Sequence, residues 1–371
     1  MALAATAQDD GQVFRVIDMR DEANRTDHIN AWLDLAPDGR TLAVAPVQSF
    51  PFRLWDTQEE RITRTLDVGN WYAGSRAEFT STGRYLLLQQ LFYLDFSVNK
   101  DRPVKHELVE VASGKVVLSF DELHAAAVTP DETAMIVMMR DGAYRVDIAS
   151  GRRDKLPLER TGYALALSND GKRLAVSHKP TKAELEAMPS VRNDKDAIKR
   201  GLKDGRIVVV YDLGTLKPMY TLGELFDKVF RLEYSPDGKD LWIHAKPNSY
   251  RTSSKNINQS YLSVADAVSG EMRRTSFPSL SPYEPDFRAS PDGKLLAIAS
   301  QGNKFMEVHL YDRATGRMVD RFVVSFRLFE KSASTNTVTS TDARMSFCFL
   351  PDSRRMLIVA GNRLIEWTYK P

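Results

Sequence analysis

A short turn sequence recurs along the chain: SPDGK occupies 235–239 and again 290–294, with APDGR at 36–40 and SNDGK at 168–172. Looser copies are TSTGR at 80–84, TPDET at 129–133 and LPDSR at 350–354. Each copy stands between two short segments in which apolar residues recur in partial alternation. Such self-similarity is typical of a propeller or another repeat array. The repeat therefore predicts the architecture of the protein, although it says little about its chemistry.

Each repeat has the pattern of four strands. In the first repeat these are 29–36, 41–47, 52–57 and 62–68, which are rich in β-branched, aromatic and other apolar residues. In the turns Pro fixes φ, Asp accepts local backbone N–H groups and Gly adopts the left-handed conformation. A second tight turn, between the third and fourth strands, follows an acidic residue at a fixed offset. We interpret these acids as structural: Asp56, Glu110, Asp147, Asp212, Asp266, Asp312 and Glu366.

The repeats predict seven blades. Their ranges are about 29–68, 75–120, 124–158, 162–222, 229–277, 284–325 and 343–369. The last repeat has three strands, whereas an isolated strand stands at 13–19, before the first repeat. Pairing of 13–19 as the missing fourth strand closes the ring and removes both open edges. The sequence thus predicts a single all-β domain over 1–371, a seven-bladed β-propeller of four-stranded antiparallel blades closed by its N-terminal strand.

With these repeats the chain resembles the WD40-type β-propeller family over nearly its whole length. One literal LWDT stands at 54–57, and VYDL (210–213) and LYDR (310–313) are related to it. The Gly-His dipeptide that precedes the first strand in that family is missing here, so the resemblance does not extend to the family's His–Ser–Asp–Trp hydrogen-bond network. It implies a divergent, WD40-like propeller of bacterial type.

Composition sets limits on partners and location. Lys plus Arg (51) nearly balance Asp plus Glu (49), so no global field would attract nucleic acid or an anionic membrane. No apolar run reaches the roughly 18 residues of a membrane-spanning helix. The small-residue start MALAATAQDD favours a periplasmic or secreted protein, with a cytoplasmic location as the alternative. The single cysteine, Cys348, lies in an apolar strand and is predicted to be buried. We expect a monomer.

The longer connections belong to one face of the predicted propeller. They are 20–28, 94–103, 181–205, 247–259, 278–284 and 325–342, and the pattern in 181–205 predicts two short helices separated at Pro189. Elaborated loops on a rigid scaffold usually carry binding sites, and aromatic residues mixed with Arg and Lys are common at contact surfaces. The predicted partner-binding residues are Phe50, Phe52, Trp71, Tyr72, Tyr93, Lys179, Lys246, Tyr250, Arg251, Lys255, Tyr283 and Arg327.

The sequence contains no GxSxG, HExxH, Walker or GxGxxG motif and no metal-spaced cysteines. His178 and His244 align one position apart in neighbouring blades, so either both face the shared gap or both face away. This pair is the weak candidate for a metal site or an acid–base pair. We predict no catalytic residue, no cofactor and no metal, hence a non-catalytic platform for a protein, peptide or glycan partner. The alternative is a propeller enzyme, a lactonase-like hydrolase or metal-dependent oxidoreductase, with its site on the same face or in the central channel.

Overall fold

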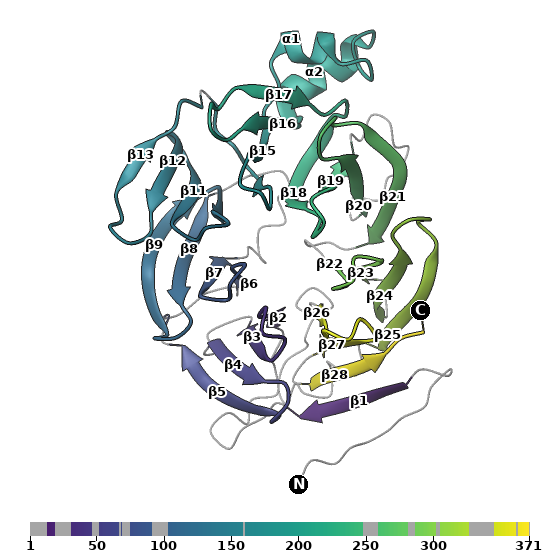
Figure 1. Cartoon of the computed structure of the whole chain (residues 1–371). Coiled ribbons are helices and arrows are strands. Elements are labelled where there is room, and N and C mark those ends of the chain that lie inside the picture. Colours follow the sequence, from purple (N-terminus) through teal and green to yellow (C-terminus); the bar gives the residue numbers. More distant parts are fainter. Residues whose placement is uncertain are drawn as a thin grey trace, which may run out of the picture. The chain divides into compact units, whose positions relative to one another are not determined.

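The computed structural model describes 13–18, 31–46, 52–66, 68, 75–90, 103–158, 160–247, 259–280, 286–301, 305–325, 345–360 and 363–370. These residues form seven antiparallel sheets of four strands each (Figure 1). In six sheets the strands pair in chain order, and in the seventh the N-terminal strand joins the last three. The predicted fold class, an all-β seven-bladed propeller, is confirmed. In the described part of the chain, no helix is long and apolar enough to cross a membrane.

The chain divides into two compact units. The first comprises 1–95, 107–119 and 279–371, and the second comprises 96–106 and 120–278. The strands β8 (Val104–Glu110) and β9 (Lys115–Leu123) have residues in both units. The organisation of 1–371 as a single domain stays a prediction.

The other strands of blades one, two, six and seven belong to the first unit. They are β2 (Ala31–Leu35), β3 (Thr41–Pro46), β4 (Phe52–Asp56) and β5 (Arg61–Leu66); β6 (Ser75–Phe79) and β7 (Tyr85–Gln90); β22 (Phe287–Ala289), β23 (Leu295–Gln301), β24 (Phe305–Asp312) and β25 (Met318–Ser325); and β1 (Val13–Asp18), β26 (Ser346–Phe349), β27 (Arg355–Ala360) and β28 (Arg363–Thr368).

Blades three to five form the second unit, except for the last two residues of their final strand, Ser279 and Leu280, which fall in the first. Their strands are β10 (Ala125–Val128), β11 (Ala134–Met139), β12 (Gly142–Asp147) and β13 (Arg153–Lys155); β14 (Leu165–Leu167), β15 (Arg173–His178), β16 (Ile207–Asp212) and β17 (Pro218–Thr221); and β18 (Phe226–Tyr234), β19 (Asp240–Pro247), β20 (Gln259–Asp266) and β21 (Met272–Leu280). Two helices, α1 (Lys182–Ala187) and α2 (Lys195–Asp204), interrupt blade four between β15 and β16. The two helices predicted around Pro189 are thus confirmed.

The repeated turns have the expected local chemistry. In the first, Asp38 Oδ1 accepts the backbone N–H groups of Arg40 and Thr41, both at 2.8 Å, and Gly39 has φ of 68°. In the second kind of turn, Asp147 Oδ1 accepts the N–H and the hydroxyl of Ser150 at 2.8 and 2.6 Å. The interpretation of Asp147 as a structural acid is therefore confirmed. The acids at 56, 212, 266 and 312 accept backbone N–H groups in the same way.

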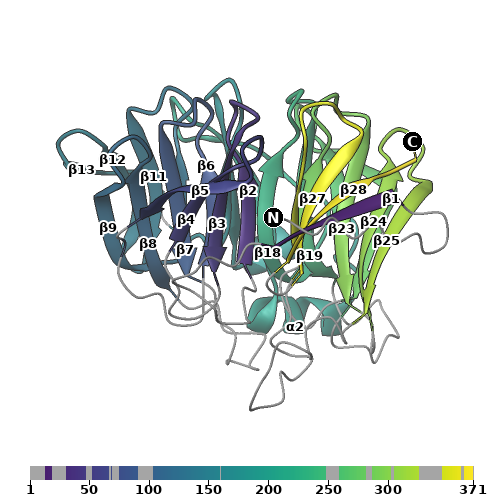
Figure 2. The same cartoon turned by 90° about the horizontal axis from the view of Figure 1, so that it is seen from below.

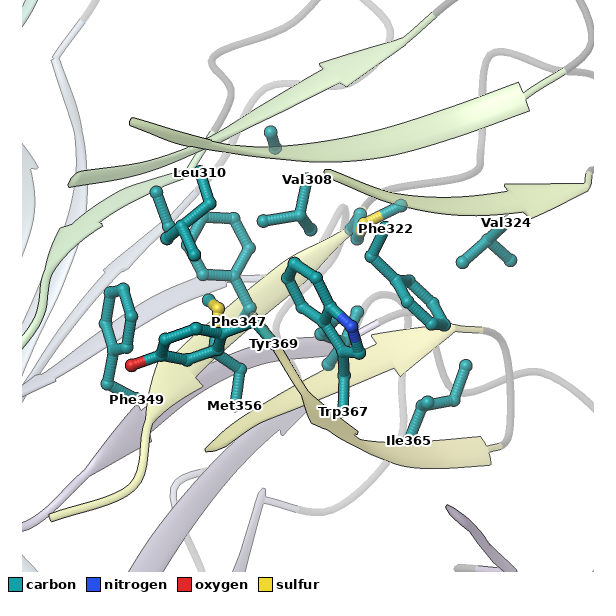
Figure 3. Packing of buried hydrophobic residues seen from close by; sticks show 14 of the residues in the cluster. Val308, Leu310, Phe322, Val324, Phe347, Phe349, Met356, Ile365, Trp367 and Tyr369 are labelled. Atoms are coloured by element: carbon teal, nitrogen blue, oxygen red, sulfur yellow. The ribbon is translucent and has the colours of Figure 1, made fainter. Parts of the chain in front are cut away.

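The N-terminal strand completes blade seven. β1 pairs with β28 over its whole length, from Val13 opposite Thr368 to Asp18 opposite Arg363. The predicted pairing of the isolated strand at 13–19 is confirmed to this extent. Apolar side chains of blades six and seven form one core, in which Trp367 is fully buried (Figure 3). Cys348 is buried as predicted, and burial raises the pKa of its thiol.

Candidate interaction surface of blade four

The helical insertion of blade four is the one predicted long connection whose structure is described in full. β15 and β16 pair up to their ends, with His178 opposite Ile207, so 179–206 leave the sheet as an excursion. Figure 2 shows α2 beyond the lower ends of the strands of its unit, such as β18 and β19. Because β15 and β16 pair with each other without any of these residues, the insertion is not needed to complete the four-stranded sheet.

Local sequence starts and stops the two helices. Thr181 and Glu184 form a capping box at α1, in which each side chain receives the other residue's backbone N–H. Asp194 caps α2 by accepting the N–H groups of Asp196 and Ala197 at 3.0 and 2.9 Å. Pro189 lies between them, where neither helix can continue. The insertion thus has a defined backbone rather than being an irregular loop.

Apolar residues hold the insertion on the blade. Leu185, Met188, Val191 and Ala197 are all buried and belong to the same apolar cluster as strands β15 and β16. Gly201 packs so closely that a Cβ there would lie 2.9 Å from the Leu185 side chain. This packing fixes both helices in place before any partner arrives.

A chain of polar contacts ties the insertion to buried residues of the blade. Arg160 makes a bidentate ion pair with Glu184 of α1, at 2.8 and 2.9 Å. Burial raises the pKa of Tyr211, although Arg160 acts in the opposite direction, and the Tyr211 hydroxyl lies 2.9 Å from His178 Nε2. The other ring nitrogen, Nδ1, lies 3.1 Å from the carbonyl oxygen of Thr161. These contacts are satisfied by a neutral imidazole that donates from Nδ1 and accepts at Nε2.

Burial of this histidine predicts a pH dependence. Burial lowers the pKa of His178 from 6.5 to about 4, so the unfolded chain takes up a proton at a pH where the folded chain does not. Stability due to His178 is therefore present above pH 6.5 and is lost as the pH falls toward 4. We expect the difference in free energy of unfolding between wild type and His178→Gln to shrink by up to about 3 kcal/mol over that interval. Urea unfolding at pH 7 and pH 4.5 measures it, and an unchanged difference would contradict this account.

The outward side of α2 is basic. Lys195, Lys199 and Lys203 are exposed at i, i+4 and i+8 and so form one stripe, beside which Leu202 is 41% exposed. Like charges at this spacing destabilise a helix by about 0.2–0.5 kcal/mol per pair. Lys203 lies 3.8 Å from Asp204, which offsets part of the repulsion at one end. We call Lys195, Lys199, Leu202 and Lys203 the α2 stripe; it suits an acidic surface that presents an apolar contact.

Three of the predicted partner-binding residues are described. Lys179 is exposed directly after β15, and its carbonyl accepts from Arg160 at 3.2 Å. Lys246 is half-buried in β19. Phe52 is only 2% exposed, and this part of the prediction is wrong, because β4 is covered on both faces and Phe52 packs in the core of blades one and two. The others lie outside the described residues: Phe50, Trp71, Tyr72, Tyr93, Tyr250, Arg251, Lys255, Tyr283 and Arg327.

The hydrogen bonds of the two candidate histidines lead to different partners. His178 contacts Thr161 and Tyr211, whereas His244 Nε2 lies 2.9 Å from Ser260 Oγ and its ring stacks on Phe230. Among the described residues, no group of three or more His, Cys, Asp and Glu side chains is placed to hold a metal ion. Each histidine is thus accounted for by contacts other than a metal.

A second polar cluster lies in the first unit, and no motif in the sequence predicted it. Asp34 of β2 accepts the N–H of Phe79 at 2.6 Å and pairs with Arg288 of β22 at 3.0 Å. Arg288 also pairs with Asp286 at 3.3 Å and donates to the carbonyl oxygen of Leu33 at 3.1 Å. We call Asp34, Asp286 and Arg288 the carboxylate–arginine cluster.

This cluster joins the first strands of several blades. Ser346 of β26 donates to Asp286 at 2.7 Å and accepts the N–H of Leu33 at 3.0 Å. Burial raises the pKa of Asp34 to about 6, although Arg288 and the N–H of Phe79 act in the opposite direction. A carboxyl group with such a pKa is a candidate general base, but both Asp34 oxygens are engaged by these donors. We therefore interpret the cluster as structural: its ion pairs and hydrogen bonds connect the first strands of neighbouring blades.

Comparisons with known proteins agree with the fold. No protein-family model matches the chain, and no curated protein matches it. Two similar solved structures are the Swd1 (Cps50) β-propeller domain of Myceliophteria thermophila and the hydrazine synthase of Kuenenia stuttgartiensis. The first is 13% identical with a TM-score of 0.59, covering 94% of this chain and 98% of that one. The second is 14% identical with the same TM-score, covering 94% and 99%. At such identities the likeness shows the propeller fold alone.

Proposed function

We propose that the protein is a non-catalytic interaction platform that binds a protein partner through the connections that include the helical insertion. The observation that carries this proposal is the insertion itself, an ordered pair of helices that blade four does not need for its sheet. Its buried side is fixed by Leu185 and Met188 and by the ion pair of Arg160 with Glu184, while its exposed side carries the α2 stripe. A surface ordered in advance loses less conformational entropy on binding.

The proposal includes the finer predictions from the sequence. The chain would be a divergent, WD40-like propeller of a bacterium, exported to the periplasm or secreted, and monomeric. A catalytic role, as a lactonase-like hydrolase or a metal-dependent oxidoreductase, is the alternative function. One of the similar structures is a propeller domain and the other is an enzyme, so this fold is compatible with both.

The α2 stripe gives the proposal a direct test. Reversal of two charges, Lys195→Glu with Lys199→Glu, should weaken partner binding at least tenfold at low salt, because the stripe would repel an acidic surface. Lys217→Glu is the matched control, since this exposed lysine lies in the β16–β17 hairpin at the opposite end of the same blade. A photo-crosslinker at position 199, compared with one at 217, would identify the partner in cells of the native organism, and binding would be measured with that partner purified.

Two outcomes would contradict the platform. Equal crosslinking from both positions, or equal binding by both charge variants, would show that the insertion is not the contact surface. Turnover of a substrate by the purified protein, with activity retained in the charge-reversed variant, would favour the enzymatic alternative instead.

A further inference from the structure

Two β-bulges distort the first strand of blade five. The pairing of β18 with β19 shifts register between Phe226 and Lys228 and again between Val229 and Arg231. The bulged strand therefore bends twice within a few residues at the start of its sheet. Bulges of this kind redirect side chains and occur disproportionately next to functional sites.

The first of these bulges places two lysines opposite each other. Lys228 pairs with Lys246 in the register of the two strands, and both side chains are half-buried. Like charges directly opposite each other destabilise a sheet. Burial, together with the charge of Lys228, lowers the pKa of Lys246, whereas Asp227 acts in the opposite direction. The two lysines thus face each other across neighbouring strands, and each has only partial access to water.

The second bulge supplies an aromatic support for this pair. Phe230 stacks on His244, with ring centroids 5.1 Å apart and planes inclined by 28°, and His244 is held by Ser260. The ammonium nitrogen of Lys228 lies 5.3 Å from the centroid of the Phe230 ring. Both His244 and Ser260 are buried, so the ring stack rests on a fixed base. The position of Lys228 is therefore set by the fold, and this site is ordered before any ligand binds.

We propose that Lys228 and Lys246 form a binding site for an oxyanion. A phosphate or carboxylate bound by both lysines would be attracted to two positive charges at once and would offset their mutual repulsion. The bound oxyanion is either a free anion, such as phosphate, or the carboxylate of an acidic side chain in a polypeptide. The site goes beyond the proposed platform, because it would bind a small anion whether or not the α2 stripe has a partner.

The test is a thermal-shift titration of the full-length protein with two probes, inorganic phosphate and hexaglutamate. We expect a saturable rise in melting temperature that is reduced at least fivefold in Lys228→Gln and in Lys246→Gln. Lys155→Gln is the matched control, since Lys155 pairs across strands with an aromatic residue, Tyr144, and its Nζ lies 5.8 Å from that ring. This control should respond like the wild type.

The two probes distinguish the sources of the ligand. A saturable response to phosphate indicates a free anion, and a response to hexaglutamate alone indicates an acidic polypeptide. Without ligand, cooperative melting of both glutamine variants shows that they fold. Equal responses of wild type and variants, or no saturable response to either probe, would overturn the proposal.

Discussion

Removal of residues 1–20 is expected to lower the free energy of unfolding by on the order of 5 kcal/mol. The deletion removes β1, whose six residues pair with β28, and leaves β28 as an open edge. It also removes Phe14, whose ring lies 5.7 Å from that of Phe322 in an edge-on arrangement, and Ile17, which is 6% exposed. Burial of one such side chain contributes about 1.5–3 kcal/mol, so two of them account for most of the expected loss.

Point variants separate the contributions of β1. Phe14→Ala should cost about 2 kcal/mol, because its ring packs against the core that Figure 3 shows. Arg15→Ala should cost less than about 1 kcal/mol, since its ion pair with Glu366 is half-exposed. Thermal and urea unfolding would measure all three proteins, and a synthetic peptide with the sequence of 11–20 should restore part of the stability of the truncated chain. A truncated chain that melts within a degree or two of the full one would show that β1 contributes little.

The pairing of β1 could be predicted because it depends on counting. Pro, Asp and Gly at fixed positions in the turns show where the flanking strands end and begin. The last repeat lacks one strand, and one additional strand precedes the first repeat. The turn signal holds even where its glycine is replaced. Glu132 and Ser353 occupy the glycine position of the looser copies and adopt the same left-handed backbone, with φ of 55° and 51°.

One regular feature of the turns was visible in the sequence and was missed. In five turns the first residue is Ser or Thr, and its hydroxyl accepts the backbone N–H five residues later. The hydroxyl thus adds a bond across the open end of each turn. The signal was the recurrence of Ser or Thr as the first residue of the turn, at positions 80, 129, 168, 235 and 290.

The candidate sites could not be predicted in the same way. Arg160 and Glu184 lie 24 residues apart, and Asp34 and Arg288 lie much further apart in the chain. Neither pair could therefore be predicted from the spacing of residues within one helix, strand or turn. The exposure of Phe52 was mispredicted for a related reason. Its position at the start of a strand was known, but whether that strand is covered on one face or both depends on its neighbours in the core. Helices α1 and α2 were predictable, because caps and Pro189 act locally.

Arg288→Met is expected to destabilise the protein by about 3–5 kcal/mol at pH 8, because it leaves the carboxylates of Asp34 and Asp286 buried without their cation. The penalty should depend on pH in a definite direction. The folded-state pKa of Asp34, about 6, already exceeds the ordinary 3.8, so the folded chain binds this proton more tightly than the unfolded chain, and stability rises as the pH falls through that interval. Loss of the guanidinium raises this pKa further, and a protonated carboxyl needs no cation.

Urea unfolding at pH 5 and pH 8 would therefore show a smaller loss at the lower pH for Arg288→Met. Adding Asp34→Asn to this variant should recover part of the stability at pH 8, since the amide removes one uncompensated charge while retaining an oxygen that can accept the N–H of Phe79. Arg76→Met is the matched control, because Arg76 also lies over the Trp32 ring, 5.6 Å from its centroid against 5.7 Å for Arg288, and pairs with the partly exposed Glu78. Its loss should be smaller and nearly independent of pH. Equal losses at both pH values for Arg288→Met would mean that packing on Trp32, rather than the charge of the carboxylate–arginine cluster, holds these strands together.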